Sequence, residues 1–168
     1  MLSHSEIDQF VELGYVRVEQ AFPNPVAQQC RDLAVEQLEI PAAPPWPEAV
    51  VRGVVDGEPF QQAANAPRLL EAVGQLLEGE RWQPRPNLGI LVVRFPSLAD
   101  PGDAGWHIDA SFQGPSTGTL YDWYVNYRSE GRGLLLLCLL SDIAVDDAPT
   151  RILEGSHHAM PPLLRPFG

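Results

Sequence analysis

Two residues with metal-ligating side chains, His107 and Asp109, lie two positions apart in the stretch Gly105–Phe112. If this stretch is extended, side chains at positions i and i+2 leave the backbone on the same face. An imidazole nitrogen and a carboxylate oxygen then point into one space, as two of the three protein ligands of a non-haem Fe(II) site do. The flanking Trp106 and Phe112 would help to exclude water from such a site. The pattern also fits a hydrogen-bonded His–Asp pair on a strand. So short a motif occurs often by chance, which keeps this alternative open.

Three further groups of polar side chains are candidates for a functional site. Arg94 ends an apolar segment, where it could bind the carboxylate of a co-substrate or simply reach solvent. His157 and His158 are adjacent, so on an extended chain they face opposite sides and at most one could join a metal. After a Gly-Ser pair they are expected in a surface loop, with one of them capping backbone groups. Asp146-Asp147 precedes Ala-Pro and is typical of a solvated turn.

The elements that must position these residues begin with helices. Ser3 and Glu6 match a capping box, and Gly14 can end the helix that follows in the left-handed conformation. Asn24-Pro25 then predicts the start of a second helix. A third is predicted from roughly Pro67 to Glu78, with Asn65 as its cap and its leucines on one face.

After the third helix, the apolar period changes from that of helices to that of strands. Leu88–Phe95 and Leu134–Leu140 are predicted to lie in one antiparallel sheet, with shorter strand-like segments at 15–19, 121–127 and 150–153. Helices followed by strands predict an α+β, mainly β fold, a sandwich or barrel. We expect a single domain, 1–168, with a helical part over about 1–80 and a partial β core over about 87–168.

The composition narrows the classes of partner. The 168 residues carry a net charge of −11, and all eleven cationic side chains are arginines. Nucleic acids and anionic membranes bind clustered positive charge, so neither is expected as a partner. No apolar run is long enough to span a bilayer, and the first residues lack the pattern of a secretory signal. Cys30 and Cys138 are interpreted as reduced core thiols, which favours a cytoplasmic location.

Three segments in series carry a resemblance to a known family. The first runs from Ile7 to Val18, a helix ending in Gly-Tyr followed by an alternating strand. The second is Trp106-His107-Ile108-Asp109, and the third is the turn, strand and Gly-Ser-His loop from Asp147 to His157. In order and spacing, these segments resemble the phytanoyl-CoA dioxygenase family of Fe(II)/2-oxoglutarate oxygenases across nearly the whole chain.

The resemblance implies a double-stranded β-helix, the jelly-roll of two facing sheets that cupins also use, with the N-terminal helices packed on it. It implies Fe(II) as the metal and 2-oxoglutarate as the co-substrate, with His107 and Asp109 as the first two metal ligands. Oxidative decarboxylation of 2-oxoglutarate by O₂ would then drive hydroxylation of an unactivated C–H bond in a small-molecule substrate.

The family's pattern continues beyond these segments. Its third ligand is a histidine on a later strand, followed by an arginine that binds the far carboxylate of 2-oxoglutarate, and the sequence ends at Gly168 before either. The histidine of the Gly-Ser-His loop is not a ligand in the family. We therefore expect the C-terminal jelly-roll strands to be missing and the 168-residue chain alone to be inactive. One hypothesis is a C-terminally incomplete dioxygenase. The alternative is a non-catalytic small-molecule-binding or structural jelly-roll module that has lost the complete metal site.

Overall fold

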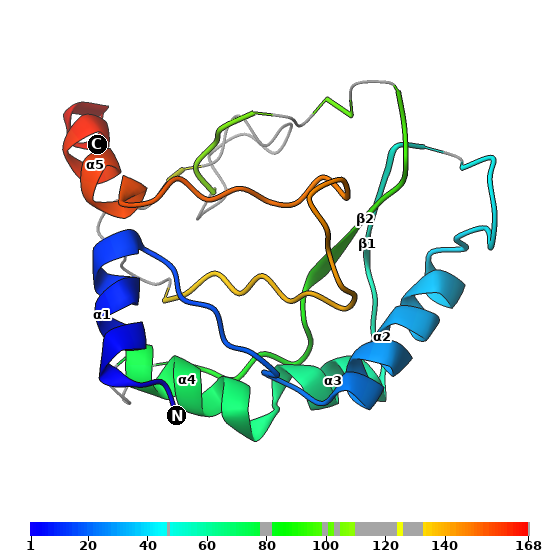
Figure 1. The fold of residues 1–168 in the computed structure, drawn as a ribbon, viewed down its shortest axis with the longest axis horizontal. Coiled ribbons are helices and arrows are strands. Elements are labelled where there is room, and N and C mark those ends of the chain that lie inside the picture. Colours follow the sequence, from blue (N-terminus) through cyan, green and yellow to red (C-terminus); the bar gives the residue numbers. More distant parts are fainter. Residues whose placement is uncertain are drawn as a thin grey trace. The chain divides into compact units, whose positions relative to one another are not determined.

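The computed structural model describes residues 1–46, 48–77, 82–98, 101–102, 105–109, 124–125 and 133–167. These residues form five α-helices, one short 3-10 helix and one pair of antiparallel strands (Figure 1). The chain divides into two compact units. The first comprises Met1–Leu2, Arg17–Ala104 and Leu136–Arg151, and the second comprises Ser3–Val16, Gly105–Leu135 and Ile152–Gly168.

The buried core of the described residues lies entirely in the first unit. Its helices are α2 (Asn24–Gln37), α3 (Glu58–Ala64) and α4 (Pro67–Leu76), and α2 packs against α3. Cys30 on α2 and Phe60 on α3 are completely buried. The buried apolar side chains are Leu2, Phe22, Cys30, Ala34, Val50, Val55, Phe60, Ala63, Ala64, Ala66, Leu69, Ala72 and Val73. By contrast, no side chain described in the second unit is fully buried.

The two strands of the first unit are β1 (Val50–Val54) and β2 (Ile90–Arg94), paired antiparallel with Val50 opposite Arg94 and Val54 opposite Ile90. Behind this sheet lies Leu38, which follows the last turn of α2. A Cβ at Gly53 would overlap the tip of the Leu38 side chain, so any larger residue there would require Leu38 to change its rotamer. The opposite face of the sheet is open at the end where Val54 pairs with Ile90, because both are about 70% exposed, whereas Val50 at the other end of β1 is buried.

The predicted jelly-roll is wrong for the part of the chain that the structure describes, because that part contains only a two-stranded sheet. β2 lies within the predicted Leu88–Phe95 strand, but it pairs with β1 and not with Leu134–Leu140. Residues 133–139 have no regular secondary structure, and most leucines there are exposed. A run of leucines has neither the period nor the β-branched side chains that specify a strand.

Other expected strands differ as well. Residues 15–19 and 150–153 have no strand structure, whereas the segment at 121–127 falls outside the described residues except for 124–125. The predicted third helix is confirmed as α4, but Asn65 ends α3 instead of capping α4. The Asn65 side chain donates a hydrogen bond to the Gln61 carbonyl at 2.8 Å, within the helix it ends.

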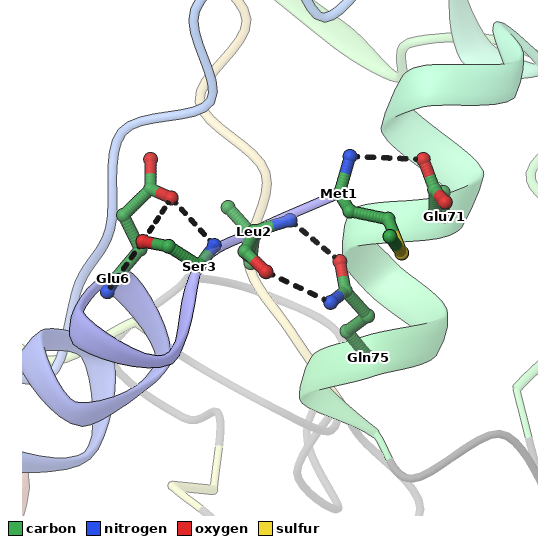
Figure 2. A network of polar contacts seen from close by, with 6 residues as sticks. All are labelled: Met1, Leu2, Ser3, Glu6, Glu71 and Gln75. Carbon is green, nitrogen blue, oxygen red and sulfur yellow. Dashed lines mark hydrogen bonds and ion pairs between the residues drawn. The ribbon is translucent and has the colours of Figure 1, made fainter.

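The first two residues are anchored to α4 within the first unit (Figure 2). The amino group of Met1 forms an ion pair with Glu71 Oε2 at 3.1 Å. The amide of Leu2 donates to Gln75 Oε1 at 2.7 Å, and Gln75 Nε2 donates back to the Leu2 carbonyl at 3.1 Å. Leu2 is buried, so these bonds satisfy a backbone that has left water.

The second unit contains α1 (His4–Leu13), α5 (Ser156–Leu164) and the 3-10 turn η2 (Arg165–Phe167). The capping box predicted from Ser3 and Glu6 is confirmed, with both reciprocal hydrogen bonds formed (Figure 2). Gly14 ends α1 at φ 86°, the left-handed conformation that the sequence predicted.

Candidate functional site

His107 and Asp109 lie close together in an irregular part of the second unit. Their side chains face one another, with Nε2 of the imidazole 3.9 Å from Oδ1 of the carboxylate. Two cis ligands of one ion, each about 2.1 Å from it, are about 3 Å apart. The two donors would therefore have to approach by about 1 Å to bind one metal, which small side-chain rotations provide.

A backbone contact favours a proton on Nδ1 of the His107 imidazole. His107 Nδ1 lies 3.3 Å from the Gly105 carbonyl oxygen. Because a carbonyl oxygen only accepts, Nδ1 must be the donor, and neutral His107 then has its lone pair on Nε2. Metal-ligating histidines are oriented in this way by a carbonyl behind the ring. The Nε2 lone pair and the Asp109 carboxylate thus face one another, an arrangement that a cation between them would stabilise.

The surroundings of this pair are wet. The side chains of His107 and Asp109 are 74% and 54% exposed. Trp106, expected to exclude water, is itself 63% exposed. Phe112, the other aromatic residue expected there, lies outside the described residues. The pair is open to solvated ions and small molecules rather than enclosed in an apolar mouth.

Within the described residues, no group of three His, Cys, Asp or Glu side chains could hold a metal ion. His157 and His158, expected in a surface loop, instead lie in the first turn of α5. The loop was expected from the Gly-Ser pair before them, whereas the helix begins at Ser156 itself and contains Pro161 and Pro162. Neither histidine joins His107 and Asp109 in a three-ligand group.

Arg94, the candidate ligand of a co-substrate carboxylate, is the last residue of β2 and belongs to the first unit. Its side chain is exposed, and its role in binding a co-substrate stays a prediction. Asp146-Asp147 forms the expected turn. Asp147 Oδ2 accepts from the Ala144 amide at 2.7 Å, and the Asp147 amide donates to the Ala144 carbonyl at 3.1 Å.

The end of α1 and the start of α5 are joined by an unexpected set of contacts. Nε2 of His157 and Nε2 of His158 lie 2.9 and 3.0 Å from one acceptor, the Val11 carbonyl oxygen. The two imidazole rings are 3.8 Å apart between centroids. The amide of Gly155 donates to the Leu13 carbonyl at 2.9 Å. The Val11 and Leu13 carbonyls, which the last turn of α1 leaves without a helical partner, thus accept hydrogen bonds from the residues that begin α5. Of the predictions made from the sequence, only the expectation that one histidine caps backbone groups anticipated these contacts.

Tyr15 and Glu154 add a side-chain contact to the same junction. The Tyr15 hydroxyl donates to Glu154 Oε1 at 2.9 Å. This hydrogen bond, followed by the negative charge of the carboxylate, raises the pKa of Tyr15 above its usual value of 10. The protonated phenol is therefore favoured in the folded protein. Its contribution to stability is complete below the unfolded pKa and disappears as pH rises through the folded one.

This contact predicts the alkaline titration of Tyr15. The difference in ultraviolet absorbance between wild type and Tyr15→Phe, followed from neutral to high pH, should give an ionisation above that of a free tyrosine. In Glu154→Gln the same difference titration should move towards the free value, because the carboxylate charge is gone. If Glu154→Gln leaves the titration unchanged, Glu154 is not the cause of the shift.

The two cysteines of the chain are free thiols in the first unit. Burial, and to a smaller extent the Cys138 thiol, raises the pKa of Cys30, and burial alone raises that of Cys138. Thiols kept protonated are poor nucleophiles and poor metal ligands. This is the behaviour expected of thiols in a structural role.

Comparisons with protein-family models, with curated proteins and with solved structures found no match to this chain. Among the helices that the structure describes, none combines the length and the apolar character needed to cross a membrane.

Proposed function

We propose that this chain supplies His107 and Asp109 as two of the three protein ligands of a non-haem Fe(II)/2-oxoglutarate-dependent dioxygenase that hydroxylates a small molecule. One observation carries the proposal. The Nε2 lone pair of His107, set by the Nδ1 contact to the Gly105 carbonyl, faces the Asp109 carboxylate across 3.9 Å. One imidazole and one carboxylate on the same side are the donor types that non-haem Fe(II) takes in such enzymes.

The role of each residue follows from its chemistry. Asp109 would bring one negative charge to the ion, and His107 a neutral nitrogen held in orientation by the Gly105 carbonyl. The bound iron would supply the activation of O₂ that hydroxylation requires. The wet surroundings of the pair would let 2-oxoglutarate, O₂ and a substrate reach the open positions.

A second candidate function is favoured by a different feature of the same pair. If His107 is protonated, the two side chains form an exposed ion pair that needs no metal. In that case the chain is a non-catalytic module that binds a small molecule or a partner. The two functions differ in whether His107 and Asp109 bind a metal.

The test is anaerobic Fe(II) binding by the 168-residue chain, with and without 2-oxoglutarate. With two protein ligands found among the described residues, we expect weak binding that 2-oxoglutarate strengthens, because the acid chelates the same ion. His107→Ala and Asp109→Asn should each weaken binding by about tenfold or more, a loss of about 1.4 kcal/mol. His4→Ala, which removes an exposed histidine on α1, is the matched control and should leave binding unchanged.

Catalysis is tested by supplying the third nitrogen from solution. Free imidazole should permit succinate formation from 2-oxoglutarate above the level of free Fe(II), and Asp109→Asn should abolish the increase. If neither variant changes Fe(II) binding, the dioxygenase proposal is wrong and the ion-pair module is favoured.

A further inference from the structure

We propose a second metal site in this chain, formed by His157, His158 and the Val11 carbonyl, that binds a divalent transition ion such as Ni²⁺ or Cu²⁺. The site joins the last turn of α1 to the first turn of α5 within the second unit. It is separate from the His107 and Asp109 pair, since no three-ligand group contains both sets among the described residues.

The distances between the donor atoms support this site. The Val11 oxygen lies 2.9 Å from Nε2 of His157 and 3.0 Å from Nε2 of His158. Neighbouring ligands of one ion are separated by about 3 Å when each bond is about 2.1 Å long. The centroids of the two imidazole rings are 3.8 Å apart, so the rings lie side by side at this carbonyl. These atoms can occupy adjacent positions around one ion.

The backbone around the site holds it together. A Cβ at position 14 would overlap the His157 ring, so the ring rests directly on Gly14. The hydrogen bond from the Gly155 amide to the Leu13 carbonyl fixes the two backbones beside the donors. The Val11 carbonyl lies at the negative end of the α1 dipole, which favours a cation, whereas the two histidines lie at the positive end of the α5 dipole, which opposes it. Because both histidines are exposed, an ion can reach them from solvent.

The charge of the second unit also favours a cation. Its described residues include a single arginine, Arg165, at the far end of α5. They carry five carboxylates: Glu6, Asp8, Glu12, Asp109 and Glu154. Such an excess of negative charge raises the local concentration of cations.

The ligand set predicts which ions bind. Two neutral imidazoles and a carbonyl provide no formal negative charge, so Mg²⁺ and Ca²⁺, which need carboxylates, should not bind here. Imidazole nitrogen suits borderline ions, and affinity should rise from Co²⁺ through Ni²⁺ to Cu²⁺. Metal binding requires each neutral imidazole to carry its proton on Nδ1, which frees the Nε2 lone pair, so the ion would replace the two hydrogen bonds to Val11.

The experiment is Ni²⁺ titration of the purified chain by calorimetry, together with Cu²⁺ electron paramagnetic resonance. His157→Ala and His158→Ala should each weaken Ni²⁺ binding by about tenfold or more. The bound Cu²⁺ spectrum should show coupling to two imidazole nitrogens in wild type and to one in each variant. His4→Ala removes an exposed histidine at the start of α1 that belongs to neither proposed site, and it should leave both readouts unchanged.

Three outcomes would overturn the site. One is the absence of Ni²⁺ binding below about 1 mM, which would leave two hydrogen bonds to Val11 as the only role of the histidines. Another is an unchanged Cu²⁺ spectrum in the double variant His157→Ala/His158→Ala. The third is an equal loss of binding in His107→Ala, which would assign the ion to the other pair. Tyr15→Phe removes a contact of the same junction but no metal ligand. If this variant still binds Ni²⁺, the losses in the histidine variants come from the missing ligands and not from a weakened junction.

Discussion

Replacing Phe60 by alanine is expected to lower the free energy of unfolding by about 3–5 kcal/mol. Phe60 lies in α3 and is completely buried in the core that the first unit builds around α2, α3 and α4. The substitution removes a large apolar side chain from this core and leaves a cavity that the surrounding structure can close only in part. Among the residues that the structure describes, this is the largest effect expected of a single truncation.

The measurement is urea unfolding followed by tryptophan fluorescence. The midpoint should fall while the slope of free energy against urea stays near its wild-type value, because the fold is kept. Leu98→Ala is the matched control, since Leu98 lies in the same unit and its side chain is fully exposed. We expect it to change the free energy of unfolding by no more than about 0.5 kcal/mol. Equal losses in the two variants would show that Phe60 is not part of a packed core.

The second large effect is expected at Gly14, where Gly14→Ala should cost roughly 2–4 kcal/mol. The residue has φ 86°, a conformation that costs an alanine about 1–2 kcal/mol. In addition, a Cβ there would overlap the His157 ring, which must then move and lose its hydrogen bond to Val11. The two costs act at the same junction of α1 with α5.

Gly155 provides the control that separates these two costs. Its φ is 70°, yet a Cβ there would meet no atom within 4 Å. Gly155→Ala should therefore cost only the backbone conformational energy. The midpoint temperature of thermal unfolding should be clearly lower for Gly14→Ala than for Gly155→Ala. Adding His157→Ala to Gly14→Ala should recover the difference, because the overlap disappears. If the two glycine variants melt at the same temperature, the ring does not rest on Gly14.

Helices with local signals could be predicted from the sequence. The capping box of α1, the Asn-Pro start of α2 and the leucine period of α4 each act within a few residues, and all three helices are present. The seven-residue α3 was missed because it is too short to show a period. α5 was missed because the Gly-Ser pair before its histidines was interpreted as part of a surface loop.

Strand pairing could not be predicted in the same way. β2 was expected, because Ile90–Arg94 is β-branched and apolar. Its partner β1 lies some 40 residues earlier and carries no signal that selects it over the leucine run at 134–140. The pairing brings together segments far apart in the sequence, and Leu38 of the α2 end lies against Gly53 of β1.

For the candidate site, the sequence predicted that the two side chains lie close together, but it did not predict how exposed they are to water. The i, i+2 spacing was sufficient to expect His107 and Asp109 side chains within reach of one another, and they lie 3.9 Å apart. Whether water reaches them depends on residues from elsewhere in the chain, and Trp106 beside them is exposed. The pairing of His157 with His158 on one carbonyl was hidden for the same reason, since Val11 is 146 residues away from the first of them.

The junction of α1 with α5 also has a consequence for biosynthesis. Between 139 and 147 residues separate the partners in its side-chain hydrogen bonds. At about 5–20 residues per second, α1 leaves the ribosome roughly 7–30 s before its partners on α5 are made. A helix of ten residues is marginal in water by itself, even with a capping box. During translation, α1 should therefore form and dissolve many times, and it should become fixed only when the last segment of the chain arrives.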